Sequence, residues 1–285
     1  MKSFKKIAII GVGLLGGSIG MAIKQKKIAT HVTGFFRDRN KIKKALSLKA
    51  IDQGTESLDI AVENADLIIL CTPVYDIVEK LKCFKRMNLG DTLITDIGST
   101  KKDILNAAKG LNFIGSHPLA GSEQSGIENA QAGLFKDSVS ILTPSNTKQT
   151  DALKKIHLFW QQIGAKTTTL SAASHDKFLA YSSHLPHALA CSLIKSIPQK
   201  ALTYGAGGLK DTTRIALAET HMWADIFLSN KEEVLKAFSA FEKNTASFKK
   251  ALIDENRNHL CTFLRKSLYQ RKKLSKTGKP DGKKS

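Results

Sequence analysis

The stretch KKIAIIGVGLLGGSIG, from Lys5 to Gly20, joins a run typical of a buried strand to a run typical of a helix. Between the two runs, Gly11, Gly13 and Gly16 form the pattern G-x-G-x-x-G. In dinucleotide-binding proteins the first glycine permits a tight turn, the second lets the backbone approach a pyrophosphate, and the third lets helix and strand pack closely. The pyrophosphate lies at the N-terminus of the helix. The opening of the chain therefore predicts a dinucleotide site.

Strand-like and helix-like segments alternate through the first half of the 285-residue chain. The predicted strands are KKIAIIG, HVTGFF, ADLIILC, TLITDIG, FIGSH and SVSILT. The predicted helices cover residues 14–25, 40–48, 101–108 and 150–163. This alternation predicts an α/β fold with a Rossmann-type, doubly wound parallel sheet that carries helices on both faces.

After AKTTTLS, residues 165–171, apolar residues recur at helical spacing and no further strand is expected. We therefore place a domain boundary near residue 168. The predicted parts are a dinucleotide-binding domain at 1–168, an all-helical domain at 169–273 and a basic, disordered tail at 274–285.

The formal net charge of +19 raises the question of nucleic acid, but the charge is uneven. From Arg265 onward the chain carries nine Lys or Arg residues against one Asp, which is typical of a solvated, solubilising end. A basic nucleic-acid-binding protein is the non-enzymatic alternative, and its affinity should disappear when the chain after Lys273 is deleted. The remaining excess suits an anionic small-molecule substrate, so nucleic acid is not the expected partner.

The composition also bears on location. No apolar run approaches the roughly 18 residues of a membrane helix, and no charged-then-apolar leader opens the chain. The cysteines are far apart and lack metal or redox spacing: Cys71, Cys83, Cys191 and Cys261. We expect a cytoplasmic protein without a membrane partner.

The end of the second predicted strand, TGFFRDR, bears on the choice between NAD and NADP. An acidic residue there hydrogen-bonds the ribose hydroxyls of NAD, whereas an arginine accommodates the 2′-phosphate of NADP. The position about 20 residues beyond Gly16 is Phe36, and Arg37 follows it. We therefore favour NADP, with Arg37 on the phosphate and Arg39 as a helper. If the strand ends two residues later, Asp38 takes the acidic role and NAD is preferred.

Two polar residues follow later strands. Ser99 comes after TLITDIG, and His117 ends FIGSH, so both are expected at the carboxyl edge of the sheet, where open α/β sheets bind ligands. Pro118 has a fixed φ and biases His117 towards an extended backbone. An imidazole held in this way beside a dinucleotide site favours catalysis.

With these motifs the chain resembles the prephenate and arogenate dehydrogenases of tyrosine biosynthesis, from about Lys5 to about Asn256. The motifs are GVGLLGGS, DIGSTK, GSHPLAGSEQSG, SSHLPHALA, GGLKDTTRIA and MWADIFLSN. The resemblance implies a nicotinamide-binding domain followed by a helical dimerisation domain, and hence a homodimer. It implies oxidative decarboxylation of prephenate to 4-hydroxyphenylpyruvate, with arogenate as the rival substrate. Another reductase with the same two domains, acting on imines or β-hydroxyacids, is a further alternative.

The resemblance also implies roles for particular residues. His117 is the base or hydrogen-bond acceptor for the C4 hydroxyl of the substrate, and Ser99 orients its imidazole. Ser122 and Glu123 lie near the substrate side chain. The residues expected to bind the cofactor are Gly11, Gly13, Leu14, Leu15, Gly16, Arg37, Thr72, Pro73 and Ser99.

The second half is expected to hold the substrate carboxylate. Lys210 and Arg214 are four residues apart, which places them on one helical face where an anion would relieve their repulsion. The guanidinium of Arg214 can hold a carboxylate with two hydrogen bonds, as the matching arginine of the family does. The structural alternative is that these residues form a solvated, basic helix start that pairs with Asp211.

His184 and His187 in SSHLPHALA admit three interpretations. The two histidines could be metal ligands, but no third ligand lies nearby in the sequence. They could instead be a structural pair at a helix start or, as the resemblance favours, substrate contacts. We favour the last and expect no metal. Trp223 and Asn230 are expected to pack and to cap. The other histidines are interpreted as structural: His31, His157, His175, His221 and His259.

Overall fold

The structure is a computed structural model that describes residues 3–121, 124–145 and 150–277. Contacts divide the chain into two compact units, Met1–Val234 and Leu235–Ser285. The helices between residues 168 and 230 thus cluster with the sheet. The domain boundary near residue 168 stays a prediction.

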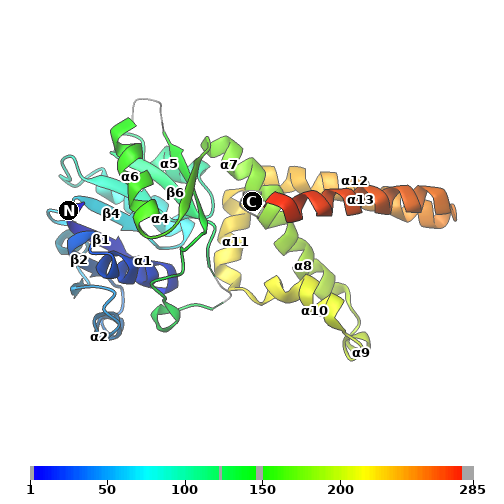
Figure 1. Cartoon of the computed structure of the whole chain (residues 1–285), viewed down its shortest axis with the longest axis horizontal. Coiled ribbons are helices and arrows are strands. Elements are labelled where there is room, and N and C mark those ends of the chain that lie inside the picture. Colours follow the sequence, from blue (N-terminus) through cyan, green and yellow to red (C-terminus); the bar gives the residue numbers. More distant parts are fainter. Residues whose placement is uncertain (1–2, 122–123, 146–149, 278–285) are drawn as a thin grey trace, which may run out of the picture. The chain divides into compact units, whose positions relative to one another are not determined.

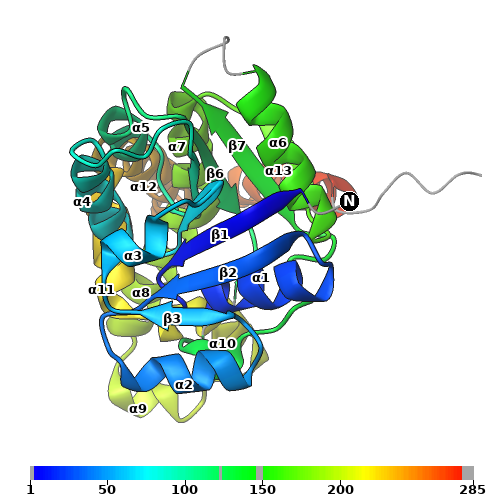
Figure 2. The ribbon, with the colours of Figure 1, turned by 90° about the vertical axis from the view of Figure 1, so that its left-hand side faces the viewer.

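The first unit contains one sheet, whose eight strands within the described ranges run in the order β3-β2-β1-β4-β5-β6-β7-β8. Figure 2 shows β3, β2 and β1 side by side in that order. The strands are β1 (Phe4–Ile10), β2 (Ala29–Phe35), β3 (Gln53–Thr55), β4 (Leu67–Leu70), β5 (Leu93–Asp96), β6 (Phe113–Pro118), β7 (Val139–Pro144) and β8 (Lys166–Thr169). The predicted α/β class with a Rossmann-type sheet is confirmed.

One strand pair corrects the expectation of a parallel sheet. β6 and β7 are antiparallel, with His117 opposite Ile141, whereas the other neighbouring strands are parallel. A parallel connection needs a crossover, usually a helix. The described part of the β6–β7 connection contains only the short 3₁₀ turn Ile127–Asn129, so the chain returns alongside β6 in the opposite direction.

The helices of the described residues cover both sheet faces and then form the second half of the chain (Figure 1). They are α1 (Leu14–Gln25), α2 (Asn40–Ser47), α3 (Leu58–Val62), α4 (Val74–Phe84), α5 (Lys102–Ala107), α6 (Thr150–Gln162), α7 (Ala172–Leu179), α8 (Leu185–Ser196), α9 (Gln199–Leu202), α10 (Gly207–Thr213), α11 (Thr220–Ser229), α12 (Lys231–Ile253) and α13 (Arg257–Thr277). A π-helical turn, Ala180–His184, joins α7 to α8, and a 3₁₀ turn, Arg214–Leu217, follows α10. After β8 the described chain is helical, as predicted.

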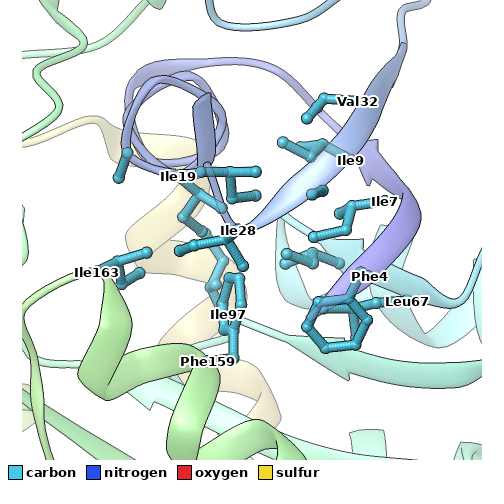
Figure 3. Packing of buried hydrophobic residues seen from close by; sticks show 14 of the residues in the cluster. Phe4, Ile7, Ile9, Ile19, Ile28, Val32, Leu67, Ile97, Phe159 and Ile163 are labelled. Carbon is cyan, nitrogen blue, oxygen red and sulfur yellow. The ribbon is translucent and has the colours of Figure 1, made fainter. Parts of the chain in front are cut away.

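Alternation along β1 separates two hydrophobic clusters, one on each face of the sheet. Ile7 and Ile9 pack with α1 and α6 on one face, as Figure 3 shows for Ile19 and Phe159. The residue between them in the strand, Ala8, joins the cluster formed with α3, α4 and α5 on the other face. All of these side chains are fully buried, and each large one contributes roughly 2 kcal/mol through burial. The two clusters fix the strand ends that carry the site.

Two segments of the second half are tied to the sheet by hydrogen bonds. The carboxylate of Asp176 in α7 accepts from the backbone N–H groups of Lys101 and Lys102, at 2.8 and 2.9 Å. The hydroxyls of Thr100 and Ser229 lie 3.0 Å apart. These contacts hold α7 and the end of α11 against the segment that follows β5.

The second unit consists of the C-terminal part of α12 and helix α13. The rings of Phe248 and Phe263 meet edge to face with centroids 5.4 Å apart, and Ser247 lies 3.2 Å from the imidazole of His259. Helix α13 continues to Thr277, into the segment predicted as a disordered tail, and residues 278–285 lie outside the described part. None of the helices in the described ranges is both long enough and apolar enough to cross a membrane.

Candidate active site

The glycine loop between β1 and α1 has the geometry that close approach to a ligand requires. Gly11 has φ +95°, and a Cβ there would lie 2.6 Å from Thr72 Cγ2. A Cβ on Gly16 would lie 2.2 Å from the carbonyl oxygen of Gly11. By contrast, a Cβ on Gly13 would meet nothing within 4 Å. Gly11 and Gly16 are therefore required by the turn itself, whereas Gly13 leaves open space on the ligand side.

This loop fits the pyrophosphate of a nicotinamide dinucleotide. The N-terminus of α1 has no side-chain cap, and its first turn contains no acidic residue, so its N–H groups can bind an anion. Leu14 and Leu15 form that first turn and are half-buried. Beside the loop, the Thr72 hydroxyl is buried without a hydrogen-bond partner in the described structure. Thr72 and Pro73 precede α4, at the carboxyl end of the neighbouring strand β4.

The segment after β2 carries the residues that bear on the adenosine ribose. β2 ends at Phe35, and Phe36 is buried while Arg37, Asp38 and Arg39 are exposed. One carboxylate oxygen of Asp38 accepts from the backbone N–H of Asn40, at 2.9 Å. The strand thus does not extend to the position that would give Asp38 the acidic role.

His117 lies near the carboxyl end of β6, as predicted, and is half-buried. Its Nδ1 lies 2.9 Å from Nε2 of His175 in α7. The Nδ1 of His175 lies in turn 2.8 Å from Oδ1 of Asp176. Both His175 and Asp176 are buried. The imidazole of His117 is therefore held by a partner from the helical half of the chain.

The connection after His117 returns to the cofactor helix. The backbone N–H of Gln131 donates to the hydroxyl of Ser18 in α1, at 2.9 Å. A Cβ on Gly17 would lie 3.0 Å from Ala130 Cβ, so the two segments are in close contact. The connection that follows β6 thus packs against α1, the helix that begins at the glycine loop.

A buried ion pair supports the same edge. The ammonium of Lys101 and the carboxylate of Asp96 are in contact and fully buried. Asp96 also accepts from the backbone N–H groups of Gly98 (2.7 Å) and Ser116 (3.0 Å). The segment that contains Ser99 is thereby fixed between β5 and α5. Ser99 itself is half-buried, and its roles toward the imidazole and the cofactor stay predictions.

Burial and titratable neighbours keep His117 neutral. Desolvation lowers the pKa of His117 well below its usual value of 6.5, and His175, Lys101 and His184 lower it further. Burial also lowers the pKa of His175, against the opposing effect of Asp176. A neutral imidazole is the form that can accept a proton. The site is thus suited to act as a base at neutral pH.

His184 and His187 lie buried beside α11. Asn230 Nδ2 lies 3.1 Å from Nδ1 of His184, and burial lowers the pKa of His184 to about 4. The ring of His187 stacks on Trp223 with centroids 3.5 Å apart and an interplanar angle of 3°. The Nδ1 of His187 is buried without a hydrogen-bond partner in the described structure. Among the described residues no group of three or more His, Cys, Asp or Glu could hold a metal ion.

The basic pair lies at the end of α10. Lys210 is in the last turn of this helix, and Arg214 follows its last residue with helical backbone angles and begins the 3₁₀ turn Arg214–Leu217. The hydroxyls of Thr212 and Thr213 bond back to the carbonyls of Gly208 and Leu209, a pattern that weakens a helix interior. Both basic residues are exposed. Ser122 and Glu123 lie outside the described residues.

Comparison with known families decides the class of the protein. Residues 19–169 match the family model of the nucleotide-binding domain of prephenate dehydrogenase, and residues 171–266 match the model of its dimerization domain. The chain belongs to the prephenate dehydrogenase family. The family assignment made from the sequence motifs is confirmed, and the chain is an oxidoreductase with a nicotinamide cofactor.

Individual family members agree with this assignment. A prephenate dehydrogenase of Lactococcus lactis is 36% identical over 253 residues, which cover 84% of this chain and 69% of that protein. A cyclohexadienyl dehydrogenase of Zymomonas mobilis is 32% identical and covers 94% of this chain and 95% of its own length. A crystal structure of prephenate dehydrogenase from A. aeolicus, in complex with hydroxyphenyl propionate and NAD+, superposes with a TM-score of 0.87 at 34% identity, covering 95% of this chain and 98% of that one.

One residue at this site was missed by the sequence analysis. His175 was interpreted as structural, yet it contacts the imidazole of His117 across 58 residues of sequence. The available signal was the His-Asp dipeptide in the first helix after the last strand, next to SSHLPHALA. That signal is weak, because only the tertiary fold brings this helix start to the end of β6.

Proposed function

We propose that this protein oxidises and decarboxylates prephenate to 4-hydroxyphenylpyruvate, with His117 as the base. The observation that carries the proposal is the placement of a neutral imidazole, fixed through its Nδ1, at the sheet edge that also carries the glycine loop. Membership of the prephenate dehydrogenase family supports it. A dinucleotide whose pyrophosphate is bound at the loop would supply its nicotinamide as the hydride acceptor.

The chemistry requires one proton acceptor and one anion clamp. The C4 hydroxyl gives its proton to His117, the C4–H bond breaks with transfer of hydride, and the bond to the ring carboxylate then breaks with loss of carbon dioxide. The electron pair of that bond enters the ring, which becomes a phenolate, and this phenolate takes up a proton to give the phenol. Arg214, with Lys210, is proposed to bind a substrate carboxylate. Replacing Arg214 with Gln is expected chiefly to raise the KM for prephenate.

His184 and His187 are proposed to face the ring and side chain of the substrate. The unpartnered Nδ1 of His187 supports this role, because a buried polar atom is costly unless it finds a partner. Ser122 and Glu123 are proposed as further pocket residues. Trp223 stacks on the His187 ring and so fixes its orientation.

For the cofactor we infer a preference for NADP. Arg37 follows the end of β2 and is exposed, and one oxygen of Asp38 is engaged by Asn40 at the start of α2. An arginine can pair with a 2′-phosphate, whereas it offers no acceptor for a ribose hydroxyl. Replacing Arg37 with Ala is therefore expected to raise the KM for NADP much more than that for NAD. Equal losses would reject the preference.

We further propose that the protein is a homodimer formed through its helical half. The match of residues 171–266 to a dimerization domain supports this. Large apolar side chains of the first unit, Tyr204 and Leu217, are 86% and 77% exposed in the single chain, so the helical half has apolar surface to bury in a partner. The expected cytoplasmic location stays a prediction.

The decisive experiment offers the purified protein prephenate and arogenate separately, each with NAD and with NADP, and follows nicotinamide reduction. We expect the highest kcat/KM with prephenate and NADP. Arogenate is the second candidate, since the Zymomonas relative is named for the cyclohexadienyl ring that both compounds share. A higher kcat/KM with arogenate would make arogenate the substrate in place of prephenate. If neither compound led to nicotinamide reduction, the proposed function would be rejected.

A further inference from the structure

The catalytic imidazole of His117 has two nitrogens, and only the one without a proton can act as the base. Its Nδ1 lies 2.9 Å from Nε2 of His175. In this contact one ring donates and the other accepts, and distance alone does not say which. The direction of this single hydrogen bond therefore decides which nitrogen of His117 is left to receive a proton.

Asp176 sets that direction. Its Oδ1 accepts from the Lys101 backbone N–H (2.8 Å) and its Oδ2 from that of Lys102 (2.9 Å). Oδ1 also lies 2.8 Å from Nδ1 of His175. An ionised carboxylate can only accept, so His175 donates from Nδ1.

The second nitrogen of His175 follows from the first. Burial lowers the pKa of His175, so near neutral pH its ring carries one proton, the one on Nδ1 that faces Asp176. Its Nε2 then carries a lone pair and no proton, so it must accept a hydrogen bond from Nδ1–H of His117. The remaining nitrogen of His117, Nε2, is consequently unprotonated.

We propose that His175 and Asp176 are positioning residues that hold His117 in the Nδ1-protonated tautomer, so that Nε2 is the atom that accepts the proton of the substrate hydroxyl. This inference rests on the proposed function for the identity of the proton donor. In the step, the substrate O–H bond breaks and the Nε2–H bond of His117 forms. The charge that then appears on the ring is stabilised through its Nδ1–H bond to His175.

We call the hydrogen-bonded side chains of His117, His175 and Asp176 the relay. The charged and titratable groups around it have opposing effects on the charge of the two imidazoles. Lys101, His184 and His175 disfavour a positive charge on His117. Asp176 and Asp96 favour a positive charge on His175, whereas Lys101 disfavours it. His117 is thus linked to the carboxylate of Asp176 through His175, and among the described residues no carboxylate lies directly against its ring. This arrangement keeps His117 neutral before the reaction. Once His117 is charged, His175 still accepts its Nδ1–H hydrogen bond.

The relay is rigid at each member. His117 is held in β6 between Ser116 and Pro118, both buried. His175 lies in the first turn of α7, whose N-cap Ser171 accepts from the backbone N–H of Ser174, at 3.1 Å. Asn230 donates to the backbone carbonyl of Asp176, at 2.8 Å. A fixed ring orientation is what a relay of this kind requires.

The tautomer can be observed directly in the wild-type protein. In protein labelled with ¹⁵N in its histidine rings, NMR distinguishes a nitrogen that carries a proton from one that does not. The His117→Gln variant, which lacks these signals, assigns them. We expect Nδ1 of His117 to carry the proton at pH 7.5 and Nε2 to lack it. A proton on Nε2 would overturn the inference, whether or not the protein oxidises prephenate.

Kinetics of variants separate positioning from mere packing. His175→Leu removes the acceptor and is expected to lower kcat on the order of 10²-fold, with KM for prephenate and the cofactor changed less than about threefold. His175→Gln keeps an amide oxygen that can accept from Nδ1–H and should restore much of the lost kcat. His31→Gln, on β2 opposite Lys6 near the start of β1, is the matched control and should leave kcat unchanged.

Two results would overturn the relay. The first is a folded His175→Leu variant with normal kcat and a normal pH profile. The second is an equal loss in the Leu and Gln variants that follows a lowered melting temperature. If His175→Leu does not fold, the wild-type tautomer and His175→Gln decide. A wild type inactive with both prephenate and arogenate would reject the proposed function, while the NMR result would still decide the tautomer.

Discussion

At the scale of single residues, the properties of the site are set by what surrounds each side chain. His117 receives its low pKa from burial and from three positive or titratable neighbours, and it receives its orientation from His175. Neither property is intrinsic to a histidine. The same residue type on an open loop would be half protonated near pH 6.5.

This environment predicts the pH dependence of turnover. Because the pKa of His117 is lowered well below 6.5, the neutral form is dominant at pH 6.5 and above. We therefore expect kcat/KM for prephenate to be constant from about pH 8 down to 6.5, and to fall only as the pH drops through the lowered pKa of the free enzyme. The measurement is kcat/KM for prephenate between pH 4.5 and 8.5 at saturating cofactor. A midpoint at or above 6.5 would contradict the assigned environment.

The sequence predicted His117 because a local pattern surrounds it, with Pro118 beside it at the end of a strand. It did not predict His175, because the partner of that side chain lies 58 residues away. Asn230 was missed as a partner of His184 for the same reason, at a separation of 46 residues. Residues that act through tertiary contacts leave little trace in their own neighbourhood.

At the scale of elements, the glycine loop offers a test that separates fold from ligand. Gly13→Ala adds a methyl group in open space, with no atom within 4 Å of the new Cβ. We expect it to lower the melting temperature much less than Gly16→Ala does, and to raise the dissociation constant for the dinucleotide at least tenfold, because the methyl group occupies the approach of the pyrophosphate. Gly16→Ala, whose Cβ would lie 2.2 Å from a backbone oxygen, should lower both stability and affinity.

Calorimetry of unfolding and fluorescence titration with NADP measure the two effects. A Gly13→Ala variant with normal affinity would show that the ligand does not approach this loop. A Gly13→Ala variant as strongly destabilised as Gly16→Ala would show that the open space next to Gly13 is not present in solution.

A second test at this scale concerns the buried pair that fixes β5 to α5. Lys101→Met leaves the carboxylate of Asp96 buried without its cation, and this is expected to cost about 3–5 kcal/mol of unfolding free energy. The matched control is Lys102→Met, the neighbouring lysine, whose pair with Glu232 is exposed and should matter little. Urea unfolding monitored by circular dichroism measures both. Similar stabilities for the two variants would contradict a structural role for the buried pair.

The elements themselves were largely legible from the sequence. The predicted strands and helices were found, because long apolar runs and helical periodicity report burial directly. The three-residue strand β3 and the short helix α3 were not predicted, since each is too short to show a period. Helix α4 (Val74–Phe84) was not predicted either, although it is 11 residues long. The antiparallel direction of β7 was also missed, because direction depends on the connection that precedes it and not on the strand residues.

At the scale of the whole molecule, the family match spans both halves of the chain, but it leaves the basic C-terminal segment beyond residue 266 unmatched. Removal of residues after Lys273 is expected to leave kcat/KM for prephenate within about twofold of the full chain, since the relay, the loop and the basic pair all lie in the first unit. Steady-state kinetics of the two chains test this. A large loss of activity would show that the segment contributes to catalysis. If only the full chain bound nucleic acid, specifically and in a salt-sensitive way, the non-enzymatic alternative would be supported.

The central claim is that the imidazole at the end of β6 removes the hydroxyl proton during oxidative decarboxylation. The most direct measurement compares wild type with His117→Asn, supplied with prephenate and NADP, and records nicotinamide reduction together with carbon dioxide release. The wild type should form reduced nicotinamide, carbon dioxide and 4-hydroxyphenylpyruvate in equal amounts, and the variant should be slower on the order of 10² to 10⁴-fold in kcat while it binds the dinucleotide normally. A folded His117→Asn variant with near-normal kcat would contradict the claim.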